Sequence, residues 1–248
     1  MSSPKNLFLS SLTPQNRDFL LENSTTVSLP LRTALYEPGL QPDFAYFMTS
    51  GIASVVTTMS EGGSAEVVVI GNEGIVGSMH ILGTAPDQTR CFMQLTGTAI
   101  RIPLAHLRKA FRASEEIRDR VLEFVQHQTL AISQIVACNR LHGAEERLAR
   151  WLLMVRDRID SDVLLLTQEF LAEMLGAQRT TVTVVAGILQ ESGLIEYRRG
   201  HVRIVNRENL EDAACDCYQV TKRLLCGLYK RTNHHSTELA SLLDSPPI

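Results

Sequence analysis

Two short stretches of the chain carry apolar residues three or four positions apart, the period of a helix that buries one face. The stripes are Phe170, Leu171, Met174 and Leu175 in the first stretch, and Val182, Val185, Ala186 and Leu189 in the second. Only residues 176–178 separate the two stretches, which predicts a tight corner and therefore a helix-turn-helix. Gly193 ends the second helix, and the alternation around Gly200 predicts a small hairpin. This order of elements is typical of a winged helix-turn-helix.

Short β-prone stretches separated by turn residues fill the region between Val27 and Ile102. They cover residues 45–48, 52–58, 65–70 and 91–102, with turns at 38–39, 50–51, 61–63 and 71–74. Many short strands at this spacing predict a compact antiparallel roll or barrel. A short helical segment, residues 7–23, is expected before it.

A long helix is predicted from Ser114, a suitable N-cap, to about Arg140. It carries two apolar rows, of which one can cover the roll while the other needs a partner, as in a coiled-coil dimer. We expect a homodimer interface on the row of Ile117, Val121, Phe124, Gln128, Ala131 and Ile135. The second row contains Leu122, Val125, Ile132 and Val136. A helix buried inside a single chain would show the same periodicity.

These elements predict an α+β chain in three parts. Residues 1–113 form an antiparallel β-roll that acts as a sensor domain, and residues 114–142 form the dimerisation helix and a hinge. Residues 143–248 form the winged helix-turn-helix domain with a C-terminal helical extension. Within this last part, further helices are expected over 144–156 and 208–229.

Charge is distributed unevenly along the chain. The 248 residues carry a formal net charge of −3, yet residues 176–207 hold five arginines and two glutamates. A basic segment on an acidic protein indicates a nucleic-acid partner. No apolar run reaches the roughly 18 residues of a spanning helix, and the polar start lacks the layout of a signal peptide. We therefore expect a cytoplasmic protein with no membrane partner.

The face of the second helix opposite its apolar stripe carries residues suited to DNA. An arginine at the start of such a helix can bind guanine, threonines can bind bases or phosphates, and an exposed valine can contact a thymine methyl group. The expected DNA-binding residues are Arg179, Thr180, Thr181, Thr183 and Val184 on the helix and Arg198 and Arg199 at the hairpin tip. An ordinary helical pair with a solvated arginine would show the same pattern.

The order of roll, long helix and winged helix-turn-helix resembles the Crp/Fnr superfamily of bacterial transcription regulators. Gly176, Arg179, Val182 and Leu189 stand at the family spacing, and the resemblance runs from about residue 7 to residue 207. It implies a homodimer that reads a palindromic operator in double-stranded DNA and contacts RNA polymerase. Where many members have glutamate and arginine this chain has Thr180 and Val184, so we expect a different half-site.

Rolls of this family usually hold a cyclic nucleotide through a Gly-Glu pair and a later Arg-Ser or Arg-Thr pair. Ser78 here replaces the glutamate, Gln88 replaces the arginine that would bind phosphate, and a neutral amide does not substitute for a guanidinium group. We therefore expect an unknown small-molecule effector other than cyclic AMP. The expected pocket residues are Gly77, Ser78, Met79, Gln88, Thr89, Arg90 and Gln128.

Cofactors known from related regulators find little support in the sequence. The five cysteines are scattered and odd in number, so a disulfide framework is not expected. An iron–sulfur cluster of the family type needs closely spaced cysteines near the N-terminus, whereas the first cysteine here is Cys91. His80 could bind haem, but a single histidine in a loop is more often a surface or packing residue.

A metal site is not expected either. Cys215-Asp216-Cys217 and His234-His235 offer ligands, but a C-x-C motif alone lacks the four-ligand spacing of structural zinc sites. On a helix, Cys215 and Cys217 would point to different sides. Cys138, near the joint between the long helix and the next domain, fits burial as a small apolar residue, with a redox role as the alternative.

The sequence contains no nucleophile elbow, P-loop, dinucleotide fingerprint or metal-ligand helix, so we do not expect an enzyme. The leading hypothesis is a DNA-binding regulator. The alternative is a ligand-sensing or scaffolding module whose helix-turn-helix contacts protein, which the exposed Val184 and Gly187 would allow. Binding to DNA that weakens with salt separates the two.

Overall fold

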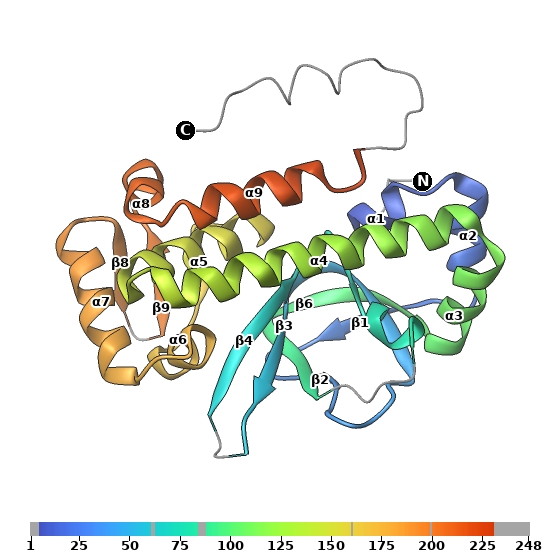
Figure 1. Ribbon diagram of the computed structural model, residues 1–248, viewed down its shortest axis with the longest axis horizontal. Helices are drawn as coiled ribbons and strands as arrows, with labels where there is room; N and C mark the ends of the chain where they lie inside the picture. Colours follow the sequence, from blue (N-terminus) through green and yellow to red (C-terminus); the bar gives the residue numbers. More distant parts are fainter. Residues whose placement is uncertain (1–4, 61–62, 84–87, 160, 199, 231–248) are drawn as a thin grey trace.

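The computed structural model describes residues 5–60, 63–83, 88–159, 161–198 and 200–230. It shows a β-roll, a long helix that crosses the roll, and a largely helical C-terminal part at one end of that helix (Figure 1). Two short helices, α1 (Leu7–Ser10) and α2 (Pro14–Leu20), precede the roll. The turn expected at 61–63 lies mostly outside the described residues, and His234 and His235 lie wholly outside them.

The roll is built from six antiparallel strands, which confirms the expected fold class. They are β1 (Thr25–Leu29), β2 (Ala34–Tyr36), β3 (Phe44–Thr58), β4 (Ser64–Ile70), β5 (Ile75–Val76) and β6 (Thr89–Pro103). Their order is β1-β6-β3-β4, with β2 beside β6 and β5 beside β3. The inward side chains, among them Phe47, Met48, Met93 and Ile102, are fully buried.

The two strands expected on either side of Ser50-Gly51 are one strand, β3. Its pairing with β6 shifts register on both sides of Ser50, which marks a β-bulge rather than a turn. Gly51 has a φ of +74°, and a Cβ built there would lie 2.6 Å from the carbonyl oxygen of Leu95. Glycine therefore allows the bulge without ending the strand, because β6 stays paired beyond it.

The long helix, α4 (Glu115–Leu141), has the predicted extent and cap. The Ser114 hydroxyl accepts a hydrogen bond from the backbone N–H of Ile117 at 3.3 Å, and Glu115 and Glu116 occupy the first turn, where the helix dipole favours acids. A shorter helix that the sequence analysis did not identify, α3 (Leu104–Ala113), connects β6 to α4.

The predicted dimer row on α4 is wrong in its first half. Ile117, Val121 and Phe124 are almost fully buried in the core of the roll, so they are not available to a second chain. Gln128 is buried as well, while Ala131 and Ile135 are half-buried. This row covers the apolar side chains of the roll and is buried against them. Exposed apolar side chains lie instead on the rest of α4, at Leu122, Leu130, Val136 and Leu141.

The winged helix-turn-helix is present as predicted. After α5 (Ala144–Ile159) come β7 (Val163–Leu165), α6 (Gln168–Leu175), α7 (Arg179–Glu191), β8 (Ile195–Arg198) and β9 (His201–Ile204). The three strands form a small sheet in the order β7-β9-β8. All eight residues of the two predicted stripes are buried, in one cluster with Leu148, Trp151 and Leu152 of α5.

That cluster also includes residues of the roll, so the two parts pack directly on each other. Phe92 of β6 meets Phe170 of α6 edge to face, with ring centroids 6.4 Å apart. Nearby, Arg158 of α5 forms a buried ion pair with Glu73 of the roll at 2.9 Å. The helix-turn-helix is therefore docked on the roll through α6, which leaves α7 at the outer edge (Figure 1).

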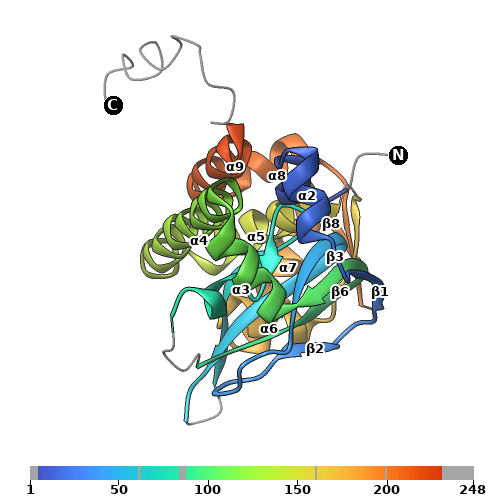
Figure 2. The ribbon, with the colours of Figure 1, turned by 90° about the vertical axis from the view of Figure 1, so that its right-hand side faces the viewer.

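The C-terminal segment forms two helices instead of the single one expected over 208–229. These are α8 (Arg207–Ala213) and α9 (Cys217–Gly227), and α9 lies along α4 (Figures 1 and 2). Beyond α9, the Tyr229 hydroxyl donates to the carbonyl oxygen of Glu73 at 3.0 Å. Cys215 stands in the break before α9, so the expectation that a helix separates the thiols of Cys215 and Cys217 is wrong.

Within the described part of the chain, none of the helices combines the length and the apolar character needed to cross a bilayer.

Candidate DNA-binding surface and effector cavity

Local sequence signals fix the geometry of the helix-turn-helix. Thr167 caps α6, its hydroxyl accepting a hydrogen bond from the N–H of Phe170 at 3.2 Å. Gly176 ends α6 in the left-handed conformation, with a φ of +56°, which suits glycine. The chain then turns within three residues and enters α7. Because the stripe of α7 is buried against α5 and α6, the opposite face of α7 is turned to solvent.

The five predicted residues of α7 all lie on this exposed side: Arg179, Thr180, Thr181, Thr183 and Val184. No carboxylate forms an ion pair with Arg179 among the residues that the structure describes, so its guanidinium group is free to bind an external acceptor. Val184 is 62% exposed. The face thus offers both an arginine, which can bind guanine, and an exposed apolar side chain, which can contact a thymine methyl group.

Thr183 differs from its neighbours because its hydroxyl is already engaged. It lies 3.0 Å from the carbonyl oxygen of Arg179 and 3.2 Å from Oε1 of Gln168 at the start of α6. A hydroxyl that donates within the motif can still accept a hydrogen bond from a base. Its present contacts link the first turns of α6 and α7.

The β8-β9 hairpin forms the wing. Arg198, at its tip, is well exposed and lies 3.0 Å from Glu196, a contact that solvent screens strongly. Gly200 has a φ of +82° in the turn, and Arg203 is exposed on β9. Arg199 lies outside the described residues. The wing thus carries exposed arginines of its own.

A cavity of about 490 Å³ opens between the roll and α4. Five of the seven predicted pocket residues line it: Gly77, Ser78, Met79, Thr89 and Gln128. Gln88 and Arg90 do not. Arg90 forms an ion pair with Glu37 at 3.2 Å and lies over the Phe92 ring, 5.3 Å from its centroid. Asp87 lies outside the described residues.

The cavity wall is largely apolar, and the described residues contribute no arginine, lysine or carboxylate to it. Valines and isoleucines of β3, β4 and β5 contribute to it, namely Val55, Val67, Val68, Ile70 and Ile75. Tyr36 and His80 meet edge to face at one side, with ring centroids 4.7 Å apart. Gln128 of α4 is buried, and its Oε1 has no hydrogen-bond partner among the described residues. The cavity therefore suits a neutral, largely apolar molecule.

Sequence reasoning did not identify these apolar wall residues or Tyr36. Alternation in a strand shows which side chains share a face, but a filled core and a cavity wall have the same pattern. Tyr36 comes from β2 and Gln128 from α4, so only the folded chain brings them together.

A buried carboxyl group that the sequence analysis missed lies where the roll meets the helix-turn-helix domain. Glu66 of β4 accepts hydrogen bonds from Ser54 at 2.6 Å, from Gln94 at 3.2 Å and from the indole N–H of Trp151 on α5 at 2.7 Å. Burial raises the pKa of Glu66 from 4.5 to about 7, although the bonds from Ser54 and Trp151 act in the opposite direction. Protonation of Glu66 therefore favours the folded state, in which this carboxyl group is buried between the two parts.

This shift predicts how stability changes with pH. The folded state holds the Glu66 proton more tightly than the unfolded state, so its contribution is complete below pH 4.5 and is lost as the pH rises through about 7. The loss amounts to about 3 kcal/mol of unfolding free energy. Urea unfolding between about pH 5 and pH 8 should show this slope, and Glu66→Gln should reduce it. Glu115→Gln, at an exposed carboxylate, is the control; an unchanged slope in Glu66→Gln would contradict the assignment.

The fold and the two sites define a two-part transcription regulator: a roll of the cyclic-nucleotide-binding type joined to a DNA-binding winged helix. The family model of the cyclic nucleotide-binding domain matches residues 26–114, and that of the Crp-like helix-turn-helix domain matches residues 146–213. Together they cover more than half of the chain. The protein belongs to the Crp/Fnr superfamily of transcription regulators.

Individual relatives are distant. The global nitrogen regulator of Synechococcus elongatus is 22% identical over 196 residues, which cover 72% of this chain and 87% of that protein. FixK2 from Bradyrhizobium japonicum superposes with a TM-score of 0.66 at 15% identity, over 77% of this chain and 98% of its own. The c-di-GMP responsive regulator CLP from Xanthomonas campestris gives 0.64 at 18%, over 78% and 100%. At these identities the structural matches show the fold alone.

Proposed function

We propose that the protein is a homodimeric, sequence-specific DNA-binding transcription regulator that responds to a neutral, largely apolar effector. The observation that carries the DNA-binding part is the exposed face of α7, where Arg179 has no ion-pair partner among the described residues and Val184 is open to solvent. Exposed arginines on both α7 and the wing favour a partner that carries phosphates over a protein partner.

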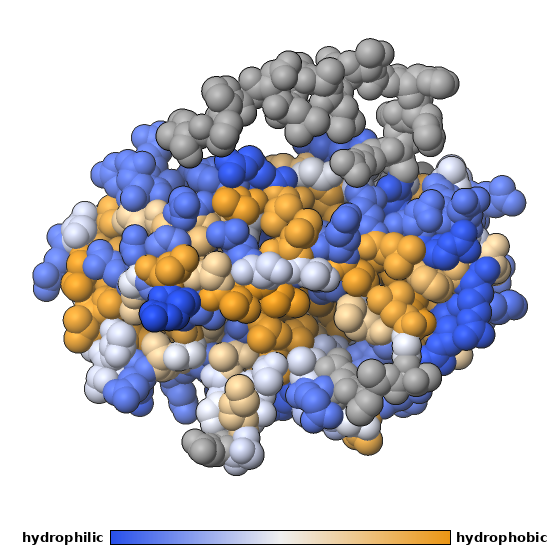
Figure 3. Space-filling view, viewed as in Figure 1, coloured by the Kyte–Doolittle hydropathy of each residue, from blue (hydrophilic) through white to orange (hydrophobic). Residues whose placement is uncertain are grey.

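Dimerisation is proposed on the outer side of α4. Leu122 and Val136 lie four helical turns apart on the same face and are exposed, even though α9 runs beside them. The space-filling view shows apolar residues gathered in a band across the face on which α4 lies (Figure 3). A second copy related by a two-fold axis would cover the same row on both chains, as closed symmetric dimers do.

DNA binding is tested by fluorescence anisotropy with duplex DNA over a range of salt concentrations. A protein that neutralises DNA phosphates releases their counterions when it binds. The logarithm of its binding constant therefore falls linearly with the logarithm of the salt concentration. We expect such a slope for duplex DNA. Absence of binding at low salt would contradict the proposal and favour the alternative, a module whose helix-turn-helix contacts protein.

The effector is proposed to be neutral because the described residues contribute no arginine or lysine to the wall to balance a phosphate. Transfer of an unpaired anion into an apolar cavity is costly. We therefore expect isothermal titration with cyclic AMP to give no binding at micromolar concentrations. A micromolar Kd would show that another residue binds the phosphate, and it would overturn the proposed effector class.

Binding of a neutral effector to the cavity can also be tested directly. Neutral metabolites with a hydrogen-bond donor are expected to raise the melting temperature by mass action. Gln128→Leu, which keeps the size of the side chain and removes its acceptor, should weaken such ligands. Gln88→Leu is the matched control, because Gln88 is exposed and does not line the cavity.

A further inference from the structure

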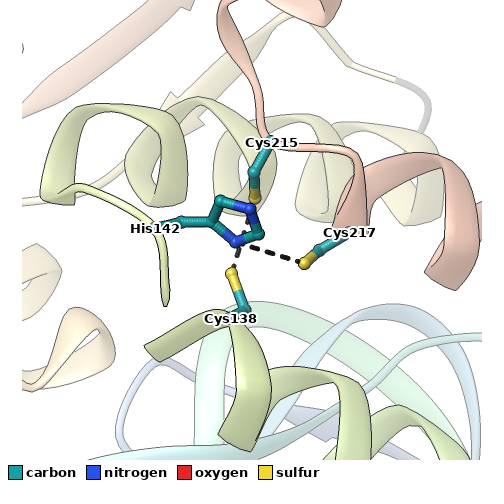
Figure 4. A group of neighbouring side chains, drawn as sticks. All are labelled: Cys138, His142, Cys215 and Cys217. Atoms are coloured by element: carbon teal, nitrogen blue, oxygen red, sulfur yellow. Dashed lines mark hydrogen bonds between the residues drawn. The ribbon is translucent and has the colours of Figure 1, made fainter. Parts of the chain in front are cut away.

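Three cysteines and one histidine from distant parts of the chain meet where α4 ends. Cys138 lies on the last turn of α4 and His142 follows that helix, while Cys215 and Cys217 come from the break before α9 and from its first residue. Their four ligand atoms all lie within 4.8 Å of one another. The side chains point toward a common centre from two stretches of the chain, residues 138–142 and 215–217 (Figure 4).

The distances fit one tetrahedral ion. With metal–sulfur bonds of about 2.3 Å and metal–nitrogen bonds of about 2.0 Å, two thiolates lie about 3.8 Å apart, and a thiolate and a ring nitrogen about 3.5 Å. Cys138 Sγ and Cys215 Sγ are 3.5 Å apart, and Cys217 Sγ and His142 Nδ1 are also 3.5 Å apart. All the described cysteines are free thiols, so no disulfide competes for these sulfurs.

The groups around these four residues are those that metal ligands require. His142 Nε2, the nitrogen that faces away from the thiols, lies 3.4 Å from a carboxylate oxygen of Asp216. A carboxylate in this position orients a histidine ligand and fixes its tautomer, so that Nδ1 is left to bind the metal. Gln134 donates a hydrogen bond to Cys217 Sγ at 3.0 Å, which supports a thiolate.

The surrounding charge is also suitable. Three thiolates and a divalent ion carry a net charge of −1, which a nearby cation would balance. Arg150 of α5 is buried and has no carboxylate within ion-pair distance in the described part of the chain. Its positive charge acts on Cys138 and Cys215, and on Glu66 at the contact with the roll. A buried guanidinium group without a paired carboxylate is costly unless another anionic group is near.

We propose that Cys138, His142, Cys215 and Cys217 bind one divalent metal ion of the zinc type in tetrahedral coordination. All four positions are filled by protein, which is the character of a structural zinc site rather than of a catalytic one. The ion joins α9 to the joint between α4 and α5. This site does not rest on the proposed DNA-binding function, since metal content is measured without DNA.

The test is the metal content of the full chain, purified without chelators, together with its ability to take up cobalt. We expect one zinc per chain and, after replacement by cobalt, the visible bands and the sulfur-to-metal charge-transfer absorption of a tetrahedral thiolate site. Cys217→Ser should abolish both signals. Cys226→Ser, at an exposed cysteine on the same helix, should leave both unchanged.

A second pair of variants separates a ligand role from a folding role. Asp216 is exposed and does not contribute one of the four ligand atoms, so Asp216→Asn should leave the fold intact and weaken zinc about 10- to 100-fold, as loss of a ligand's partner does. His142→Cys should keep metal binding while changing the cobalt spectrum.

Three results would overturn the proposal. The first is a wild-type chain that binds neither zinc nor cobalt under reducing conditions, and the second is a brown chromophore that contains iron and sulfide. The third is a Cys217→Ser variant that keeps its zinc.

Discussion

Val136→Asp is expected to convert the protein into a monomer and to remove tight binding to a two-fold symmetric site. Val136 is 64% exposed on α4, although it is apolar. In a two-fold dimer along α4 the substitution places two carboxylates at the interface, where burial of unpaired charge is costly. Each chain then binds only one half-site, and the loss of the second contact lowers affinity roughly 100- to 10,000-fold.

Sedimentation velocity at micromolar concentration and anisotropy on a palindromic duplex measure the two effects. Leu40→Asp is the matched control, because Leu40 is 66% exposed and lies in a loop of the roll, away from α4. It should remain a dimer with unchanged affinity. If Val136→Asp also remains a dimer, the second copy does not pack along this row of α4.

Arg179→Ala is expected to remove sequence preference while leaving non-specific binding nearly unchanged. Arg179 stands at the first residue of α7, from which a guanidinium group can reach a base edge in the major groove. The loss should be about 1 to 3 kcal/mol on the preferred site, with reduced discrimination at one base pair in each half-site. On random DNA the affinity should hardly change.

Arg198→Ala provides the contrast, because the wing tip is suited to the phosphate backbone. This variant should weaken all sequences alike and lower the salt slope by about one, and we expect the same of Arg199→Ala. Affinities on preferred and random duplexes across a salt series measure both behaviours. If Arg179→Ala keeps the full preference, then α7 reads bases through Thr180, Thr183 and Val184, or it does not enter the groove.

The helix-turn-helix was predictable because its signals are local. The apolar period, the cap Thr167 and the left-handed Gly176 all lie within a few residues of the elements that they determine. Strands β3, β4 and β6 were also predictable from β-prone stretches, whereas β1, β2 and β5 were not identified. The bulge at Gly51 was not, because a glycine in a strand and a glycine in a turn look alike until the partner strand β6 is placed beside it.

Contacts between distant segments could not be derived from the sequence. The two apolar rows of α4 were recognised, but periodicity does not tell which row the roll covers, and the first row proved to be that one. Cys138 and Cys215 are 77 positions apart, and their proximity depends on the break between α8 and α9. Glu66 likewise became a candidate only when Trp151 was found beside it.

The most direct test of the central claim is selection of binding sites from random DNA by the full-length protein. We expect an enriched site with two inverted half-sites, whose centres lie about one helical turn, roughly 10 base pairs, apart. We also expect Arg179→Ala to lose the preference at one symmetric pair of positions. Enrichment of no sequence at all, or of a single site without an inverted repeat, would contradict a two-fold dimer that reads DNA through α7.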